Sequence, residues 1–169
     1  CGVPAPGVSI KIFDDNGKEI DEPGVPGELY AKSVAVFDTY YKSHDQYLED
    51  HRDGYQTVGD IAYVDNEGYY FICDRKKDMI ITGGVNVYPA EIENVLDDHP
   101  QVAEVAVFGI PDDEWGEAVC AVIVCMDNLN EKELINFAKD RLSGPKVPKK
   151  VFIRSDLPKT GSGKVLKRE

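Results

Sequence analysis

The sequence predicts an α+β protein in two parts: a β-rich part over residues 1–74 and a small α+β part over residues 79–169. Strand-like alternation of apolar and polar residues dominates the first part, and two helix patterns with clear start and stop signals lie in the second. Hydrophobic residues make up 42% of the 169 residues, which is enough for a folded core.

The first part is expected to contain strands joined by tight turns. Residues 8–14 alternate with period two and run into an Asn-Gly turn. Strands at 59–64 and 69–73 flank the turn sequence DNEG. The stretch between 32 and 57 is expected to be irregular, with at most a short helix near DQYLED.

The second part opens with a helix signal. Pro89 suits the first helical position, and Pro100 marks the stop. The apolar residues of this helix share one face at spacing i, i+3, i+4: Ile92, Val95 and Leu96. Strands are expected next at 102–109 and 118–125.

A second helix follows with stronger markers. Asn130 is a good N-cap, Glu133 completes a capping box, and Gly144 with the following proline ends the helix. Its predicted core face consists of Leu134, Phe137, Ala138 and Leu142. A last strand at 150–155 precedes a terminal loop.

Charge is unevenly distributed along the chain. The net charge is −12, which argues against non-specific binding to nucleic acid or to an anionic membrane. Residues 146–169, however, carry +6 and the remainder −18. This basic stretch is either a solvated end or a local anion site.

The cysteines and histidines predict neither a disulfide framework nor a metal site. Cys1, Cys73, Cys120 and Cys125 contain no C-x-x-C pair, and the three histidines are scattered. Free thiols suit a reducing cytoplasm. The longest apolar run spans nine residues, fewer than the ~18 that a membrane helix needs. No transmembrane segment is therefore expected, and the opening at Cys1 without Met suggests a piece of a longer protein.

The terminal sequence PKTGSGKVLKRE looks at first like a nucleotide-binding P-loop, but it does not fit one. Val165 stands where a Ser or Thr must bind magnesium, and Pro158, which has no N–H, replaces the first glycine. The chain also ends five residues after Lys164, which leaves no room for the helix that binds the phosphate. Lys164 on a Gly-Ser-Gly tip needs another explanation.

Four motifs supply that explanation by resemblance. YQTVGD at 55–60, DRKKDMIITGG at 74–84, VYPAEIE at 87–93 and LPKTGSGK at 157–164 together resemble the adenylate-forming acyl-CoA synthetase family, relatives of firefly luciferase and of peptide-synthetase adenylation domains. The resemblance covers the whole chain as the last third of such an enzyme.

This resemblance implies a domain organisation. Residues 1–74 would be the end of the β-barrel subdomain of the large N-terminal domain, and residues 75–78 the hinge. Residues 79–169 would form the small mobile lid domain, a mixed sheet with flanking helices. The phosphate loop, the magnesium-binding glutamate and the acyl pocket of the family would lie upstream.

The resemblance also implies roles for single residues. Asp60 and Arg75 would contact the ribose of ATP, which suits a carboxylate acceptor and a charged guanidinium fork. The family usually has Gly before this arginine, and this sequence has Asp74. Lys77 would be the hinge pivot. Without the family, a turn-capping residue would be the better reading of Asp60, and Arg75 could equally form a surface ion pair.

The remaining implied residues serve the two half-reactions. Gly83 and Gly84 would line the passage for the pantetheine arm of CoA. Lys164 would bridge the carboxylate substrate and the α-phosphate of Mg-ATP while acyl-AMP and pyrophosphate form. Without the family, an ordinary turn would be the better reading of the two glycines.

The expected function is therefore that of an AMP-forming acyl-CoA synthetase, inactive as an isolated fragment. The partners would be a small carboxylic acid, ATP with Mg²⁺, CoA and the upstream domain. Fatty-acyl, medium-chain or aryl acids are favoured as substrates. The alternatives are an acyl-AMP ligase that loads a carrier protein, and a non-catalytic interaction module.

Overall fold

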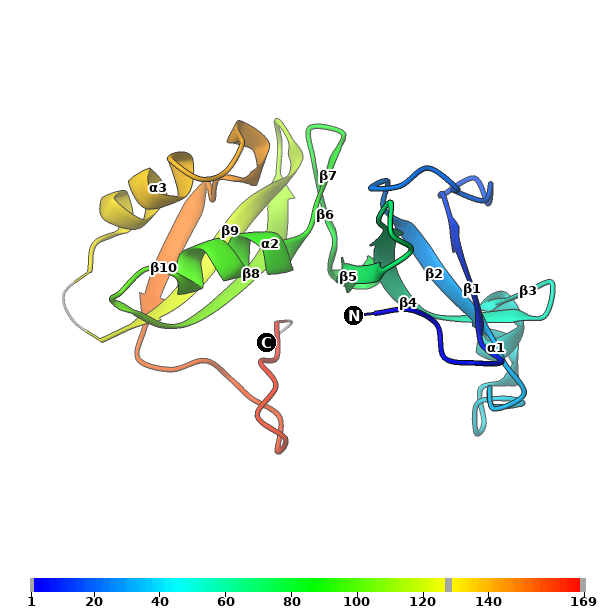
Figure 1. Ribbon diagram of the computed structural model, residues 1–169. Coiled ribbons are helices and arrows are strands. Elements are labelled where there is room, and N and C mark those ends of the chain that lie inside the picture. The colour runs from blue at the N-terminus through cyan, green and yellow to red at the C-terminus, as the bar shows by residue number, and fades with distance from the viewer. Residues whose placement is uncertain (1, 127–128, 168–169) are drawn as a thin grey trace. The chain divides into compact units, whose positions relative to one another are not determined.

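The computed structural model describes residues 2–126 and 129–167. The chain divides into two compact units, Cys1–Lys77 and Asp78–Glu169, here called unit 1 and unit 2. Each unit has a five-stranded sheet of its own (Figure 1).

Unit 1 is an antiparallel sheet built around one long strand. Its elements are β1 (Ser9–Phe13), β2 (Gly27–Lys32), α1 (His44–Glu49), β3 (His51–Arg52), β4 (Tyr55–Val64) and β5 (Tyr70–Arg75). The strand β4 pairs with β2, β3 and β5, and β2 also pairs with β1. All these pairings are antiparallel, so this part of the chain has the β-rich character that the sequence predicts.

Two strands of unit 1 differ from the expectation. The strand β4 begins at Tyr55 and not at residue 59, so Asp60 lies inside a strand and not at a strand start. The strand β2 was not singled out from the sequence, although its residues Gly27–Lys32 form the second strand of the sheet. Local alternation in GELYAK is weak, and its pairing with β4 comes from residues about thirty positions away.

Unit 2 has a mixed sheet. After the 3₁₀ turn η1 (Lys76–Asp78), its elements are β6 (Ile80–Thr82), β7 (Val85–Val87), α2 (Pro89–Asp97), β8 (Val102–Asp112), β9 (Gly116–Cys125), α3 (Glu131–Lys139), η2 (Gly144–Lys146) and β10 (Lys150–Arg154). The strand β10 runs parallel to β9, whereas β6 and β8 pair with β9 antiparallel. The predicted α+β class, with a mixed sheet and flanking helices, is confirmed.

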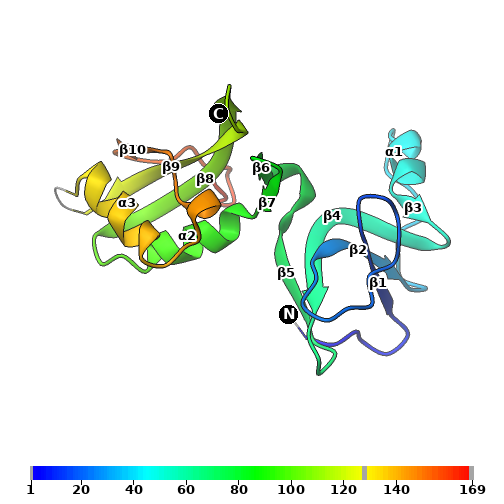
Figure 2. The same ribbon diagram turned by 90° about the horizontal axis from the view of Figure 1, so that it is seen from above.

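Both helices cover the same face of this sheet (Figures 1 and 2). The core between the helices and the sheet includes Ile92 and Leu96 from α2, Leu134 from α3, and Val107 and Ile123 from the strands. Each of these side chains is at most 1% exposed. Burial of aliphatic side chains of this size contributes about 1.5–3 kcal/mol each, so this face holds much of the stability of unit 2.

The helix signals are confirmed at their starts, and one is wrong at its end. Pro89 begins α2, and the side chain of Asn130 accepts a hydrogen bond from Glu133 N at 3.0 Å, as an N-cap does. The helix α3 ends at Lys139, five residues before Gly144. Leu142 is nevertheless buried, because the chain turns back and Leu142 N donates to Ala138 O at 2.8 Å.

The opposite face of the unit 2 sheet carries the C-terminal segment. Side chains alternate along a strand, so Ala106, Phe108, Val122 and Phe152 point away from the helices. These residues and the segment after β10, including Leu157 and Leu166, line a pocket of about 350 Å³. Unit 2 thus has three layers: two helices, a sheet and the C-terminal segment.

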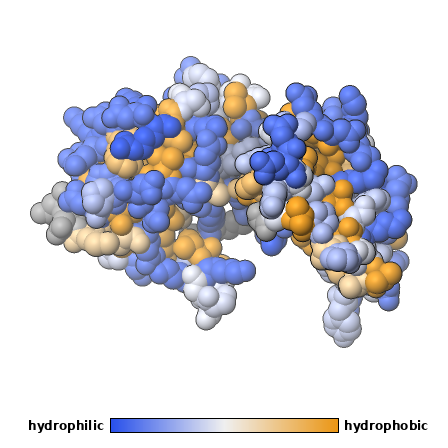
Figure 3. All heavy atoms as spheres, in the orientation of Figure 1, coloured by the Kyte–Doolittle hydropathy of each residue, from blue (hydrophilic) through white to orange (hydrophobic). Residues whose placement is uncertain are grey.

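Hydrophilic side chains cover most of the visible face of each unit, with smaller hydrophobic patches between them (Figure 3). No helix in the described ranges is long and apolar enough to cross a membrane. Cys120 and Cys125 are free thiols, and Cys1 lies outside the described residues. Cys120 is fully buried, and this burial raises the pKa of its thiol.

Candidate functional site

The first candidate site is an ion pair between neighbouring strands of unit 1. Asp60 on β4 and Arg75 on β5 are direct cross-strand partners, and Arg75 Nε lies 3.0 Å from Asp60 Oδ1. The aspartate side chain is 25% exposed and the arginine side chain 53%. The structure therefore brings together the two residues that the resemblance assigns to ATP, and both retain polar atoms that a ligand can reach.

A bulge in β4 sets the position of Asp60. Between the pairs Tyr30↔Thr57 and Glu28↔Ile61, β2 has one residue and β4 has three. Gly59 lies within this bulge at φ +78°, a conformation that favours glycine. Bulges of this kind re-aim side chains and are frequent next to active sites.

The buried hydroxyl of Thr57 stabilises the bulge. Thr57 Oγ1 donates to Leu29 O at 2.9 Å and accepts a hydrogen bond from Gly59 N at 3.0 Å. The same oxygen lies 3.2 Å from a carboxylate oxygen of Glu28. The threonine of the YQTVGD motif thus has a structural role in the bulge, whereas the role implied for its aspartate is functional.

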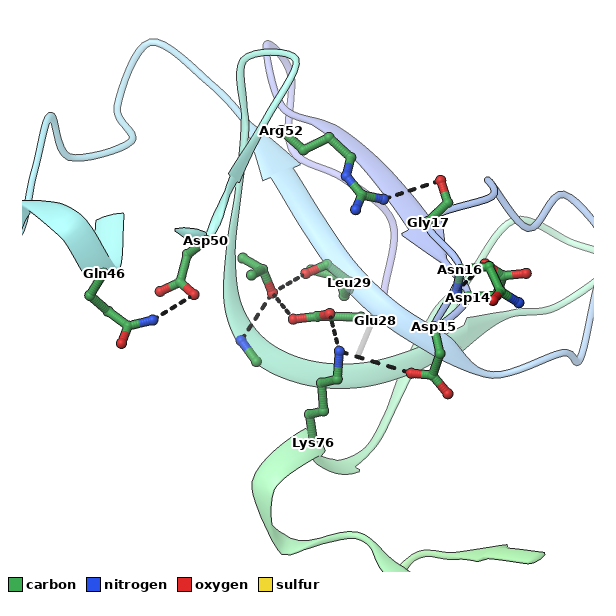
Figure 4. Close-up of polar contacts among 12 residues, drawn as sticks. Asp14, Asp15, Asn16, Gly17, Glu28, Leu29, Gln46, Asp50, Arg52 and Lys76 are labelled. Carbon is green, nitrogen blue, oxygen red and sulfur yellow. Dashed lines mark hydrogen bonds and ion pairs between the residues drawn. The ribbon is translucent and has the colours of Figure 1, made fainter. Parts of the chain in front are cut away.

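A cleft of about 390 Å³ lies beside this bulge, lined in part by Gly59 and Arg75. Lys76 also lines it and donates to Glu28 Oε2 at 2.8 Å, with Asp15 farther away at 3.9 Å (Figure 4). The hydrogen bond to Glu28 raises the pKa of Lys76 above its ordinary 10.5. The stabilisation from this pair is therefore present at neutral pH and is lost only as the pH rises through this elevated pKa.

Lys77 lies in the short turn η1 between β5 and β6. The boundary between the two compact units falls directly after it. A 3₁₀ turn of three residues is a frequent connector and has weaker hydrogen-bond geometry than an α-helix. This location is compatible with a pivot, and the pivot itself remains a proposal.

Gly83 and Gly84 form the two-residue loop of the hairpin between β6 and β7. Their φ values are +57° and +78°, as a type I′ turn requires at both central positions. The two glycines differ in their surroundings. A Cβ on Gly83 would come within 2.7 Å of the Trp115 ring, whereas a Cβ on Gly84 would meet nothing within 4 Å.

Replacement of these glycines by alanine is expected to destabilise unit 2 unequally. Each change places a non-glycine residue in the left-handed region, at about 1–2 kcal/mol. Gly83→Ala adds a clash with Trp115, which we expect to cost about 1 kcal/mol more, the low end of overpacking. The half-exposed indole can shift to relieve part of the clash.

Urea unfolding followed by the fluorescence of Trp115, the single tryptophan, measures this difference. Gly84→Ala is the matched control, since it shares the backbone strain and lacks the clash. Equal destabilisation by the two variants would contradict a packing role for Gly83.

Lys164 lies on a hydrogen-bonded hairpin and not on a loose tip. Thr160 N donates to Lys164 O at 2.8 Å, Gly163 N to Thr160 O at 2.9 Å, and Leu166 N to Pro158 O at 2.8 Å. Lys164 itself is exposed. Within residues 2–126 and 129–167, no carboxylate forms an ion pair with it. Its ammonium group is thus available to an anionic ligand.

Several polar contacts escaped the sequence reasoning. Lys76 was assigned no role of its own from the sequence, yet it pairs with Glu28, 48 positions away. Glu93 and Glu104 were assigned no role, and both form ion pairs with lysines that flank Lys164. No local signal predicts such pairs, because strand register and chain path decide them.

The comparisons with known proteins agree with this architecture. Residues 91–164 match the family described as AMP-binding enzyme C-terminal domain. The chain is 46% identical over 169 residues to a long-chain-fatty-acid–CoA ligase of Escherichia coli O6:H1, covering 99% of the chain and 30% of that relative. It is 42% identical to a feruloyl-CoA synthase of an Amycolatopsis species, covering all of the chain and 35% of that relative.

Solved structures show the same fold. The o-succinylbenzoate CoA synthetase (MenE) of Bacillus subtilis, in complex with its acyl-adenylate intermediate OSB-AMP, superposes with a TM-score of 0.92 at 37% identity, covering 98% of the chain and 34% of that structure. ATP-bound MatB of Rhodopseudomonas palustris gives a TM-score of 0.90 at 38% identity, covering 97% of the chain and 33% of that structure.

Fold and matches together define the class: the C-terminal part of an AMP-binding enzyme. Residues 91–164 match the AMP-binding enzyme C-terminal domain family, and the resemblance to adenylate-forming acyl-CoA synthetases is confirmed. The chain spans about a third or less of the length of the relatives and structures named here.

Proposed function

We propose that this chain is the C-terminal part of an AMP-forming acyl-CoA synthetase. The strongest support is the 46% identity to a long-chain-fatty-acid–CoA ligase along 99% of the chain. The reaction has two steps. A carboxylate oxygen attacks the α-phosphorus of ATP and displaces pyrophosphate; the thiol of CoA then attacks the acyl carbon, loses its proton and displaces AMP.

Asp60 and Arg75 would hold the nucleotide. The Asp60 carboxylate is an acceptor suited to the two hydroxyls of ribose, and Arg75 at 3.0 Å orients it and neutralises part of its charge. Arg75 has further N–H donors for ribose or phosphate oxygens. Arg75 lines the cleft beside the bulge, and the Asp60 side chain next to it is 25% exposed, so a ligand in this region could reach both.

Lys164 would act in the first step. Its charge would bridge the attacking carboxylate and the α-phosphate oxygens, and so stabilise the charge that develops in the transition state. The hydrogen-bonded hairpin supports this role, because it fixes the backbone from which the side chain reaches out.

Lys77 would serve as the pivot between the two orientations of unit 2, one for each step. Gly83 and Gly84 would then line the passage of the pantetheine arm. The type I′ turn supports this assignment only at Gly84, where nothing lies within 4 Å of a Cβ position. Gly83 packs against the Trp115 ring, and this close contact alone explains why a glycine is needed at position 83.

The co-substrates follow from the same proposal. ATP would enter as its Mg²⁺ complex, with the magnesium ligands and the acyl pocket in the part of the protein outside this chain. Magnesium would shield the phosphate charges from the incoming carboxylate. CoA is the proposed acceptor, and the upstream domain the proposed structural partner.

An acid panel tests the proposal with the full-length protein. Long-chain, medium-chain and aryl acids are each assayed for ATP-dependent pyrophosphate release, and then for thioester formation with CoA or with a phosphopantetheinylated carrier protein. We expect both activities with CoA for at least one acid. Thioester on the carrier alone would favour an acyl-AMP ligase, and absence of pyrophosphate release across the panel would favour a non-catalytic module.

A further inference from the structure

The segment that carries Lys164 is fastened to unit 2 at both of its ends. This segment, residues 155–167, is called the strap. It leaves β10 and forms the hairpin Pro158–Leu166, in which Lys159 and Val165 bridge. Two ion pairs hold the strap on either side of Lys164: one at Lys159 within the hairpin and one at Lys167, directly after it.

The first ion pair joins the strap to the outer face of β8. Lys159 Nζ lies 2.7 Å from Glu104 Oε1, and the two side chains are 39% and 35% exposed. Glu104 Oε2 is buried and has no hydrogen-bond partner among the described residues. Lys159 is therefore the group that compensates this partly buried charge, and its removal would leave the carboxylate unpaired.

The second ion pair joins the strap to α2. Lys167 Nζ lies 2.7 Å from Glu93 Oε1, and these side chains are only 22% and 21% exposed. The same Glu93 oxygen accepts a hydrogen bond from Val107 N on β8, also at 2.7 Å. Among the described strands, β8 pairs only with β9, so Glu93 satisfies an amide on the open side of β8.

The two anchors lie on opposite sides of β8. Glu104 shares the outer face with Ala106 and Phe108, whereas Glu93 projects from a helix on the other face. The strap thus runs from the outer face of β8 to its open edge, where Glu93 bonds both Lys167 and Val107 N. Apolar side chains of the strap do not fill the space against the sheet, because a pocket of about 350 Å³ lies between them. The ion pairs therefore add to the attachment of the strap.

We propose that Glu93 and Glu104 are positioning residues for Lys164: they hold the strap in the geometry that presents the lysine to the reacting carboxylate and α-phosphate. This inference rests on the proposed function of Lys164. The two glutamates touch neither substrate nor reacting atoms; they act through the hairpin backbone.

The test neutralises each glutamate in the full-length enzyme. Partly exposed ion pairs are weak, so Glu104→Gln and Glu93→Gln should each slow acyl-AMP formation at most about two- to fivefold, and the double variant more. Glutamine keeps an acceptor for Val107 N, so the fold of unit 2 should be retained. Thioester formation from supplied acyl-AMP should not change.

Glu91→Gln is the matched control. Glu91 also lies on α2 and pairs with a lysine at 2.7 Å, but its partner is Lys146, outside the strap. Loss of the Glu91–Lys146 ion pair should leave the rates of both half-reactions unchanged. Glu104→Lys alone should slow adenylation, because it places two lysines opposite each other. The double variant Glu104→Lys, Lys159→Glu restores an ion pair of opposite polarity and should recover the lost adenylation activity.

Hydrogen exchange of the Leu166 amide supplies a readout that does not require activity. This amide closes the hairpin onto Pro158 O, so its exchange should accelerate in Glu104→Gln and Glu93→Gln and not in Glu91→Gln. Unchanged exchange together with an unchanged ratio of the two half-reactions would overturn the inference. A wild-type protein without adenylation activity would instead overturn the proposed function, and the exchange result would still decide whether the glutamates hold the strap.

Discussion

Lys164→Ala in the full-length protein is expected to slow acyl-AMP formation by about 10²–10³-fold, the loss typical when one preorganised electrostatic donor is removed. The reason is local: Lys164 is exposed, has no ion-pair partner among the described residues, and projects from a fixed hairpin. Folding should be unaffected, because the side chain contributes no buried contact.

The decisive measurement compares both half-reactions on one preparation. Thioester formation from chemically supplied acyl-AMP should stay near the wild-type rate, because unit 2 would then have rotated about Lys77 and withdrawn Lys164. Lys132→Ala, which removes an exposed lysine from α3 of the same unit, is the control. If both half-reactions fell equally, Lys164 would be a general binding residue, and the two-orientation mechanism would lose its main support.

Asp60→Ala is expected to raise the KM for ATP by about 10–100-fold, because it removes charge-assisted hydrogen bonds worth about 1.5–3 kcal/mol in total. The change also leaves Arg75 without the partner at 3.0 Å, but a guanidinium that is 53% exposed remains solvated. Folding of unit 1 should therefore be little affected.

Steady-state kinetics at varied ATP and saturating acid checks this expectation. Glu19→Gln is the control, since it breaks the exposed Lys11–Glu19 pair in the same unit. An unchanged KM for ATP together with reduced stability would show that Asp60 serves the bulge and not the nucleotide.

Local signals predicted the helix starts well and the sheet pairings poorly. Pro89 and Asn130 act on their own first turns, so their effect is visible in the sequence. The end of α3 was misplaced because Gly144 is a strong stop signal, whereas the chain leaves the helix at Asp140 through a turn without glycine or proline. The strand β2 depends on partners in β1 and β4, which no short window contains.

The candidate site shows the same division. Motifs singled out Asp60 and Arg75 one at a time, but their ion pair results from the register of β4 and β5, and that register contains an irregularity between Ile61 and Ala62. The role of Gly83 in packing depends on Trp115, 32 positions later, whose carbonyl also accepts the Gly83 N–H. Sequence alone offered no reason to separate Gly83 from Gly84.

The parallel pairing of β10 with β9 implies an order of events in folding. β8 and β9 are joined by a short loop and can pair early, whereas β10 reaches its place only after the chain has passed through α3. Until then, one side of β9 between Cys120 and Val124 lacks its partner strand. Cys120, opposite Lys150 in this pairing, is fully buried in the complete unit 2, so loss of the reactivity of its thiol during refolding would report completed packing of the unit.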